Sequence, residues 1–313
     1  MHLLSLLQQH PMRATQSIPE SMLGCFKRRS IAFANGQTDT QTHVFWLQSR
    51  NLTIDLRLPV EAEWVQPKAW QDYTEAELRQ LANQEGWCAD TLWQDERLSW
   101  SGGTSLQTHN RWPEPAILHR VGDCMMEFAP SGAYVEGWRL KSRTPGPLVG
   151  LRLLQEEEVQ TGRVRHRQGA LIINGDWAGL VLGRPNPLSP EASQLRDRVS
   201  GRAGDERFLQ QVFCVETSVG QGNLTSGYTT AYSTLPERRG RPLFSLEGFE
   251  FDPVCQEVIQ EWEEEGKTLR RRYTIDTLES TFPYLAETPC SSESNAWFNT
   301  EQETLGRYLQ VVE

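Results

Sequence analysis

The stretch that decides the fold class is Val44-Phe-Trp-Leu-Gln-Ser-Arg-Asn-Leu-Thr-Ile-Asp-Leu-Arg-Leu-Pro59. Its apolar residues alternate with polar ones, and this period of two is typical of a β-strand that buries one face. Ser49-Arg50-Asn51 interrupts the pattern, as a turn does. The stretch therefore predicts two antiparallel strands, 43–48 and 52–58, joined by a short turn.

Similar strand-like segments follow along most of the chain, and one helix interrupts them in each half. Thr74 and Glu77 form a capping box ahead of the first helix, and Ser189-Pro190 begins the second. Segment 208–216 predicts a strand, and the tail from Thr281 is expected to be irregular. The other predicted strands are 26–33, 87–93, 97–101, 116–121, 124–128, 133–141, 148–156, 162–166, 170–174, 177–182, 243–251, 257–263 and 268–275.

The opening stretch has a counterpart later in the chain. Ala170-Leu-Ile-Ile-Asn-Gly-Asp-Trp-Ala-Gly-Leu-Val-Leu-Gly-Arg-Pro185 repeats the order strand, turn, strand and proline at an offset of 170 − 44 = 126. Glu127-Phe-Ala-Pro130 before Trp138 matches Glu250-Phe-Asp-Pro253 before Trp262, at offsets of 123 and 124. Offsets that agree this closely indicate an internal duplication.

The strand pattern and the duplication together predict a mostly β fold. We expect two tandem calycin-like (lipocalin-like) antiparallel β-barrels, each with one short helix, because closure removes edge strands and leaves room for one small ligand. A β-sandwich gives the same local signals and is the alternative. The break at Thr144-Pro-Gly-Pro147 separates the halves. The predicted parts are an N-terminal arm (1–24), a first barrel (25–145) and a second barrel with an irregular tail (146–313).

Composition excludes several classes of function. The 313 residues carry 31 Lys+Arg against 41 Asp+Glu, a net charge of −10, and a chain without a basic stripe is not expected to bind nucleic acid. No apolar run approaches the roughly 20 residues of a membrane span, so no membrane insertion is expected. Six scattered cysteines without CxxC spacing indicate reduced thiols and a cytoplasmic protein. No metal site and no cofactor are predicted.

Three parts of the sequence resemble a known family. They are Arg28-Arg-Ser-Ile-Ala-Phe-Ala-Asn-Gly36 with Asn51-Leu-Thr-Ile-Asp-Leu-Arg57, then Gly132-Ala-Tyr-Val-Glu-Gly-Trp-Arg139, and Gly169-Ala-Leu-Ile-Ile-Asn-Gly-Asp-Trp-Ala-Gly179. These parts are similar to stretches of the fungal Hri-type, kinase-associated proteins, and the resemblance is strongest over residues 26–185. It implies two lipocalin-like domains and permits a protein partner, but it transfers no catalytic residues.

The polar face of strand 52–58 is the first candidate site. Asp55 and Arg57 correspond, at the offset of 126, to Val181 and Gly183, so the charged pair exists only in the first half. If this face points into a barrel, the two charges bind each other or a polar ligand, because an unpaired buried charge is costly. An Arg in that place can hold a carboxylate. The sequence alone nevertheless favours a solvated face for both residues.

The second candidate lies on strand 133–141, where Glu136 shares a face with Tyr134 and Trp138. A carboxylate between aromatic rings in a cavity has a raised pKa and can transfer protons. The second half has Gln260 beside Trp262 at the related place, so the acid is again confined to the first half. The alternative, which the sequence slightly favours, is an exposed Glu between rings packed on the surface.

Histidines complete the candidate residues. No two of them have the i, i+2 or i, i+4 spacing that indicates a metal site. If the protein is an enzyme, Glu136 and His119 are the predicted catalytic residues. The predicted ligand-binding residues are His43, Trp46, Asp55, Arg57, His109, Tyr134, Trp138 and Arg139.

Three functions stay open at this point. The favoured one is binding of a small, mainly apolar or amphipathic molecule, with a polar or anionic end, in the first barrel. The second is a cofactor-independent isomerase, hydratase or lyase that uses the same pocket. The third is a protein-interaction scaffold whose barrels are filled by side chains.

Overall fold

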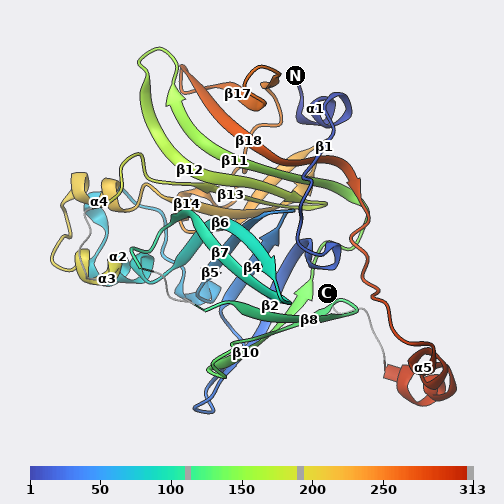
Figure 1. Cartoon of the computed structure of the whole chain (residues 1–313). Coiled ribbons are helices and arrows are strands. Elements are labelled where there is room, and N and C mark those ends of the chain that lie inside the picture. Colours follow the sequence, from blue (N-terminus) through green and yellow to red (C-terminus); the bar gives the residue numbers. More distant parts are fainter. Residues whose placement is uncertain (110–113, 189–193, 309–313) are drawn as a thin grey trace.

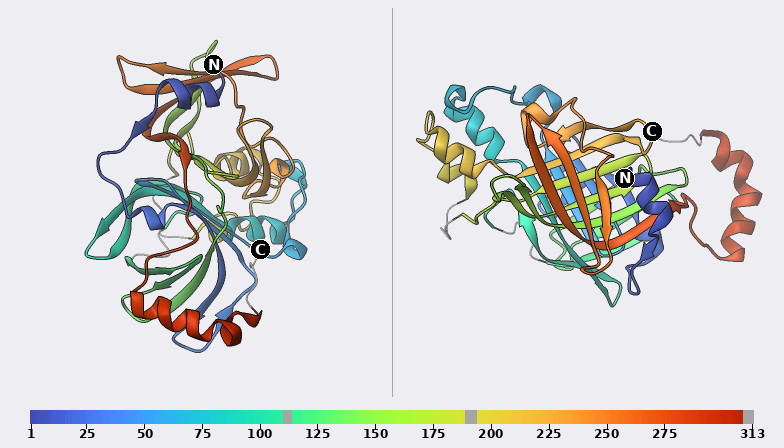
Figure 2. Two further views of the ribbon diagram at one scale, coloured as in Figure 1. Left: turned by 90° about the vertical axis from the view of Figure 1, so that its right-hand side faces the viewer. Right: turned by 90° about the horizontal axis from the view of Figure 1, so that it is seen from above.

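The computed structural model describes residues 1–109, 114–188 and 194–308. Two antiparallel β-sheets dominate the secondary structure, which confirms the predicted mostly β fold (Figure 1). The first sheet closes into a barrel. The second is a curved open sheet that packs against one side of this barrel, as two further views show (Figure 2).

Eight strands close the barrel, because β10 pairs with β9 on one side and with β2 on the other. A barrel, and not the alternative β-sandwich, is therefore the fold of the first half. The short strand β3 (Thr38–Asp39) extends β2 at one end. The barrel strands are β2 (Gly24–Phe33), β4 (His43–Gln48), β5 (Leu52–Leu58), β6 (Glu85–Gln94), β7 (Arg97–Ser105), β8 (Ala116–Val121), β9 (Cys124–Phe128) and β10 (Tyr134–Leu140).

The second half does not confirm the prediction of another closed barrel. Its last strand, β18, inserts between β11 and β17, and β15 and β16 become the sheet edges, with no pairing between them in the described part of the chain. The strands of this sheet are β1 (Met12–Arg13), β11 (Gly146–Glu158), β12 (Arg163–Asn174), β13 (Trp177–Leu182), β14 (Glu216–Asn223), β15 (Gly227–Ser233), β16 (Phe249–Asp252), β17 (Glu257–Glu264) and β18 (Lys267–Phe282).

The N-terminal arm covers the concave side of this second sheet. Helix α1 (Leu3–Gln9) buries Leu3, Leu6 and Leu7 in a core built from strands β11 to β18. Spacing of three and four residues places these leucines on one helix face. The amide of Leu3 donates to the carbonyl of Leu246 at 2.8 Å, which fixes the start of the helix. Apolar side chains therefore fill the interior of the second half.

The contact between the two sheets is apolar and close. Leu47, Ile54 and Leu56 of the barrel pack against Ile172 and Val181 of the second sheet. A Cβ atom on Gly179 would lie 3.1 Å from Leu47 Cδ2 and 3.2 Å from Ile54 Cδ1, so this glycine permits the close approach. Because the second sheet covers the outer face of β5, the inner face of that strand is the only other place for its polar side chains.

The capping box predicted ahead of the first helix is confirmed. Glu77 N donates to Thr74 Oγ1 at 3.3 Å, and Thr74 N donates to Glu77 Oε2 at 2.9 Å, at the start of α2 (Glu75–Ala82). The predicted start of the second helix at Ser189-Pro190 lies outside the described residues. Two short helices follow it, α3 (Leu195–Arg198) and α4 (Glu206–Val212).

Three predicted segments differ from the structure, and of segment 243–251 only the last part is a strand, β16, which begins at Phe249. Segment 208–216 is not a strand: α4 covers its first half, because Asp205 caps that helix and because Leu209 and Val212, three residues apart, are both buried. The tail is not irregular throughout, since it contains α5 (Ser292–Leu305), which Ser291 caps. Single-turn 3₁₀ helices complete the fold at Glu20–Met22, Glu61–Glu63, Trp70–Asp72, Pro236–Arg238 and Gly306–Tyr308.

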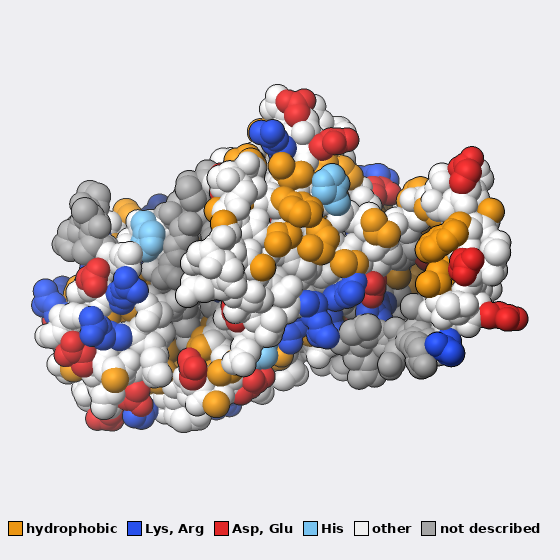
Figure 3. Space-filling model, turned by 90° about the horizontal axis from the view of Figure 1, so that it is seen from below, with side chains coloured by type: hydrophobic (Ala, Val, Ile, Leu, Met, Phe, Trp, Pro, Cys, Tyr) orange, Lys and Arg blue, Asp and Glu red, His pale blue; other side chains and the backbone are white. Residues whose placement is uncertain are grey.

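Helix α5 stands away from the body of the molecule, and hydrophobic side chains lie on its surface (Figure 3). None of its residues is buried, and Trp297 is 59% exposed. A helix without a buried face has no hydrophobic stripe, which is why the sequence pattern does not reveal it. In the described part of the chain, no helix is long and apolar enough to cross a membrane.

A buried arginine joins the two sheets at the turn between β4 and β5. Arg50 is fully buried, and its Nε and Nη2 donate to the two carboxylate oxygens of Glu279 on β18, at 2.6 and 2.8 Å. Next to it, Ser49 Oγ and Asn51 N donate to Asp276 Oδ2, at 2.7 and 3.0 Å. A two-point pair of this kind fixes direction as well as distance. It sets the register between the turn and β18.

Replacing Arg50 by Ala is therefore expected to destabilise the fold. The change leaves the Glu279 carboxylate without its main partner, and breaking a buried ion pair in this way costs about 3 kcal/mol. Urea unfolding measures the loss. Arg29→Ala on β2, at an exposed position, is the matched control and should change the free energy of unfolding by less than about 0.5 kcal/mol. Equal stability of the two variants would contradict this role of Arg50.

Candidate functional site

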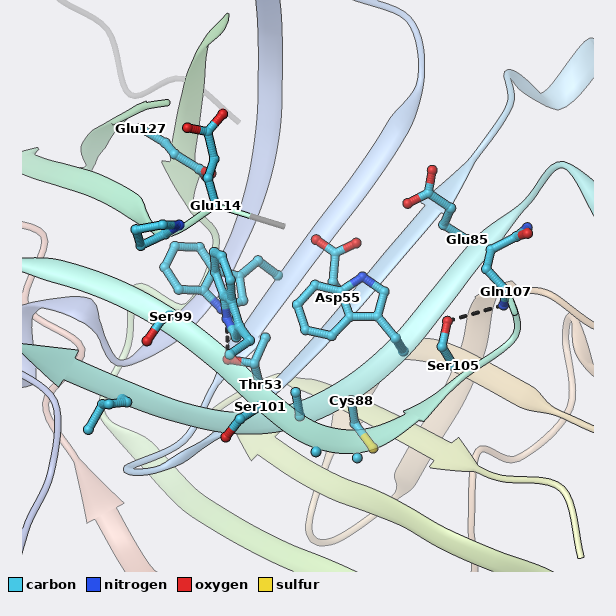
Figure 4. Close-up of a pocket in the computed structure, with 18 of the residues that line it drawn as sticks. Thr53, Asp55, Glu85, Cys88, Ser99, Ser101, Ser105, Gln107, Glu114 and Glu127 are labelled. Carbon is cyan, nitrogen blue, oxygen red and sulfur yellow. Dashed lines mark hydrogen bonds between the residues drawn. The ribbon is translucent and has the colours of Figure 1, made fainter. Parts of the chain in front are cut away.

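The barrel encloses a cavity of about 930 Å³, which Figure 4 shows from close range. Small-molecule sites in proteins span about 300–1,000 Å³, so this cavity is of that class. Strand β7 pairs with β8 only at Arg97↔Ile117 and Leu98↔Ala116, and the rest of β7 lines the cavity. Five aromatic side chains form much of its wall: Trp46, Trp87, Trp100, Tyr134 and Trp138.

A buried hydrogen-bond network holds two of these rings in place. Trp46 Nε1 donates to Gln48 Oε1 at 3.0 Å, and Trp100 Nε1 donates to Thr53 Oγ1 at 3.2 Å. Thr53 Oγ1 in turn donates to the same Gln48 oxygen at 2.5 Å. Indole groups whose N–H is already bonded keep their orientation, so the wall is ordered before any ligand arrives.

Asp55 and Arg57 lie inside the barrel and both line the cavity. Asp55 is 3% exposed, and it accepts from Arg57 Nε at 2.9 Å and from Nη2 at 3.4 Å. The solvated face that the sequence favours for them is wrong, because β5 is covered on its outer side by the second sheet. Their burial and mutual pairing agree with the other interpretation.

Glu136 is also buried, with 1% of its surface exposed, so the expectation of an exposed Glu is wrong as well. Its Oε1 accepts from Arg28 Nη1 at 2.8 Å and lies 3.5 Å from Arg57 Nη1. Its Oε2 has no hydrogen-bond partner within the described residues. Glu136 is not among the described residues that line the cavity. Glu136 therefore pairs with Arg28 and Arg57 without lining the cavity itself.

Two acidic residues of the site are not among the residues predicted from the sequence. Glu127 lies directly opposite Glu136 across β9 and β10, and Glu85 lies opposite Arg57 across β5 and β6. Both line the cavity, where Figure 4 shows Glu127 with Glu114 on one side and Glu85 with Gln107 on the other. Strand register places these two acids beside Glu136 and Arg57, and an alternation pattern alone does not predict register.

The surroundings of Glu127 make it a protonated acid near neutral pH. It is 6% exposed, and its oxygens accept from Tyr134 Oη at 3.3 Å and from Trp138 Nε1 at 3.1 Å. Burial, followed by repulsion from the Glu136 carboxylate, raises the pKa of Glu127 to about 8. Burial also raises the pKa of Asp55, to about 6, although Arg57 opposes the change.

The remaining predicted residues divide between the cavity and the outside. His109 lines the cavity at an exposed position. His43 lies outside the barrel, where its Nε2 is 2.9 Å from Glu61 Oε1. His119 is exposed and packs edge-on against Phe128, so it does not meet Glu136 in one site. Arg139 projects outward and lies 3.4 Å from Asp123. Strand alternation explains Arg139, because its neighbour Trp138 faces inward.

The predicted duplication, aligned at an offset of 126, pairs residues that point to different faces of their strands. At the offset of 126, Asp55 faces the barrel interior, whereas Val181 packs in the contact between the two sheets. The offset therefore compares opposite faces. On β13 the side chains that face the second interior are Leu180 and Leu182, so the contrast remains: the first interior is charged at this strand and the second is apolar.

Neither a metal centre nor a known relative accounts for the cavity. Among residues 1–109, 114–188 and 194–308, no group of three or more His, Cys, Asp or Glu side chains is placed to hold a metal ion. No protein-family model, curated protein or solved structure matches the chain. The functional conclusion therefore rests on the cavity and its side chains.

The raised pKa of Glu127 predicts a specific pH dependence of stability. A group whose pKa is higher in the folded state than in the unfolded state stabilises the fold at low pH, and this contribution disappears as pH rises through the folded pKa. Glu127→Gln removes the titrating group. Its free energy of unfolding, relative to the native chain, should therefore rise by at least about 1 kcal/mol between pH 5.5 and pH 9.

Denaturant unfolding at the two pH values measures this difference. Glu250→Gln, the same change at an exposed position of the second half, is the control and should behave alike at both. If Glu127→Gln also shifts stability equally at pH 5.5 and pH 9, Glu127 titrates normally and the account of its surroundings is wrong.

Proposed function

We propose that this protein binds one small, mainly apolar molecule with a polar end inside the first barrel. The observation that carries this proposal is the cavity of about 930 Å³ whose wall combines aromatic rings with buried carboxylates. A closed eight-stranded antiparallel barrel is the architecture in which lipocalins hold a single small ligand. We infer a lipocalin-like use of the first half on this basis.

Buried charge inside the barrel supports binding over simple packing. Residues that only fill a core are apolar, since a buried carboxylate costs stability unless it is paired. Asp55, Glu85 and Glu127 are buried and all line the cavity. Polar groups retained at such a cost, around open space, are typical of a site that must orient a ligand.

The second half supports the same view by contrast. Its core holds leucines of α1 and apolar side chains of the sheet, and its buried Glu156 and Arg271 bond directly to each other at 2.7 Å, which is the arrangement expected of a structural support. We infer that the two halves arose by duplication and that only the first has kept or gained a site. The alternative of a protein-interaction scaffold with filled barrels would fit the second half, but it does not explain the cavity in the first barrel.

One observation favours a second candidate function, a cofactor-independent proton-transfer enzyme. Glu127 touches the cavity and, with a raised pKa, carries a proton near neutral pH. A general acid of an isomerase, hydratase or lyase needs both properties. In this alternative Glu127 takes the place that the sequence analysis gave to Glu136, and His119 has no part.

Titration with N-phenyl-1-naphthylamine, an uncharged dye that fluoresces in apolar sites, tests the binding function. We expect one dye molecule per chain. Ala89 is buried on β6 and lines the cavity beside Trp87 and Thr53, so Ala89→Trp fills the space. This variant should weaken dye binding at least about tenfold, because a bulky ring removes the volume that the dye occupies.

Val254→Trp is the matched control, since Val254 is 90% exposed in the second half. It should bind the dye as the native chain does. Unchanged binding by Ala89→Trp, with thermal unfolding as cooperative as that of the control, would place the dye elsewhere and contradict the proposal.

A further inference from the structure

Among the described residues, acidic side chains outnumber basic ones in the interior of the first barrel. Arg57 lies next to Asp55, Glu136 and Glu85, whose charges all act on it. Arg28 is bonded to Glu136 at 2.8 Å and to Asp39 at 2.6 Å. Two guanidinium groups thus face three buried carboxylates and the partly exposed Asp39, and Glu127, protonated near neutral pH, lies beside them.

An anionic ligand end is disfavoured by this arrangement. Of the described residues, Arg57 is the basic side chain in the buried part of the cavity wall, and Asp55 accepts from it at two points, 2.9 and 3.4 Å. An incoming carboxylate would have to break that pair and would then lie among like charges. In a low-dielectric interior, like charges that are not screened repel strongly.

A positively charged end meets the opposite conditions. Indole and phenol faces attract cations, and four Trp and one Tyr line the cavity. Gln107, which also lines it, is 7% exposed and donates through Nε2 to the carbonyl oxygens of Ala82 and Gln84, yet its Oε1 has no donor in the described part of the chain. This oxygen lies on the Glu85 side of the cavity, where an additional N–H donor would be stabilised (Figure 4).

We propose that the ligand of the first barrel is an aromatic or amphipathic amine, bound as its ammonium between the tryptophan faces and the carboxylates of Glu85 and Asp55, beside Glu127, whose ionised form a neighbouring ammonium favours. This inference rests on the proposed binding function and names the class of ligand. The apolar body of the amine fills the cavity, and its ammonium lies among the acidic side chains.

Competition against N-phenyl-1-naphthylamine tests the charge of the ligand. The competitors share one ring system: 1-naphthylmethylamine is a cation, 1-ethylnaphthalene is neutral and 1-naphthylacetate is an anion. We expect the amine to displace the dye at a concentration about tenfold lower than the neutral compound. The acetate should be the weakest of the three. An equal or greater affinity of the acetate, or equal affinities of amine and neutral compound, would overturn the inference.

Variants assign the preference to the site. Glu127→Gln and, independently, Glu85→Gln should each reduce the affinity for the amine at least about threefold and leave that for 1-ethylnaphthalene unchanged. Glu250→Gln, exposed in the second half, should alter neither. An amine preference that survives in both cavity variants would show that it arises elsewhere.

The two proposals fail in different ways. If the dye and 1-ethylnaphthalene bind but the amine has no advantage, only the inference about charge is wrong. If neither the dye nor any of the three compounds binds, the binding function itself is contradicted.

Discussion

The constraint on which the structure depends is that strand β5 is covered on both faces. Its odd face, with Asp55 and Arg57, points into the barrel, and its even face, with Ile54 and Leu56, packs on the second sheet. Charges on such a strand are largely removed from solvent, and an unpaired buried charge is costly, so pairing inside the barrel is expected. The partners that the barrel supplies, Glu136 and Glu85, make its interior acidic. The second sheet thereby determines the chemistry of the first barrel.

The two halves then serve different purposes from similar strand patterns. In the second, β18 adds a strand and α1 covers the concave face, so apolar side chains occupy the interior. In the first, hydrogen bonds to Gln48 and Thr53 fix the rings of Trp46 and Trp100, and open space remains. Packed interiors normally close such voids. We propose that a ligand occupies this open space.

Alternation in the sequence is sufficient to predict most of the strands, the first barrel and the shared face of Tyr134, Glu136 and Trp138. It does not reveal which face of a strand meets solvent, because that depends on the second sheet. For this reason the sequence favours a solvated face for Asp55, which the structure buries. The same alternation excludes Arg139 from the face of Trp138 and His43 from that of Trp46. Glu85 and Glu127 depend on strand register, and α5 lacks any hydrophobic stripe.

We propose that the first barrel is a hollow, acidic site for an aromatic cation. The most direct measurement is the anomalous signal of bromine in crystals of the full chain soaked with a brominated naphthylmethylamine. We predict one strong peak inside the barrel, among Trp46, Trp100 and Trp138, with the ammonium within hydrogen-bond distance of a cavity carboxylate. A barrel interior filled by side chains, or a bromine peak found only outside the barrel, would contradict the account.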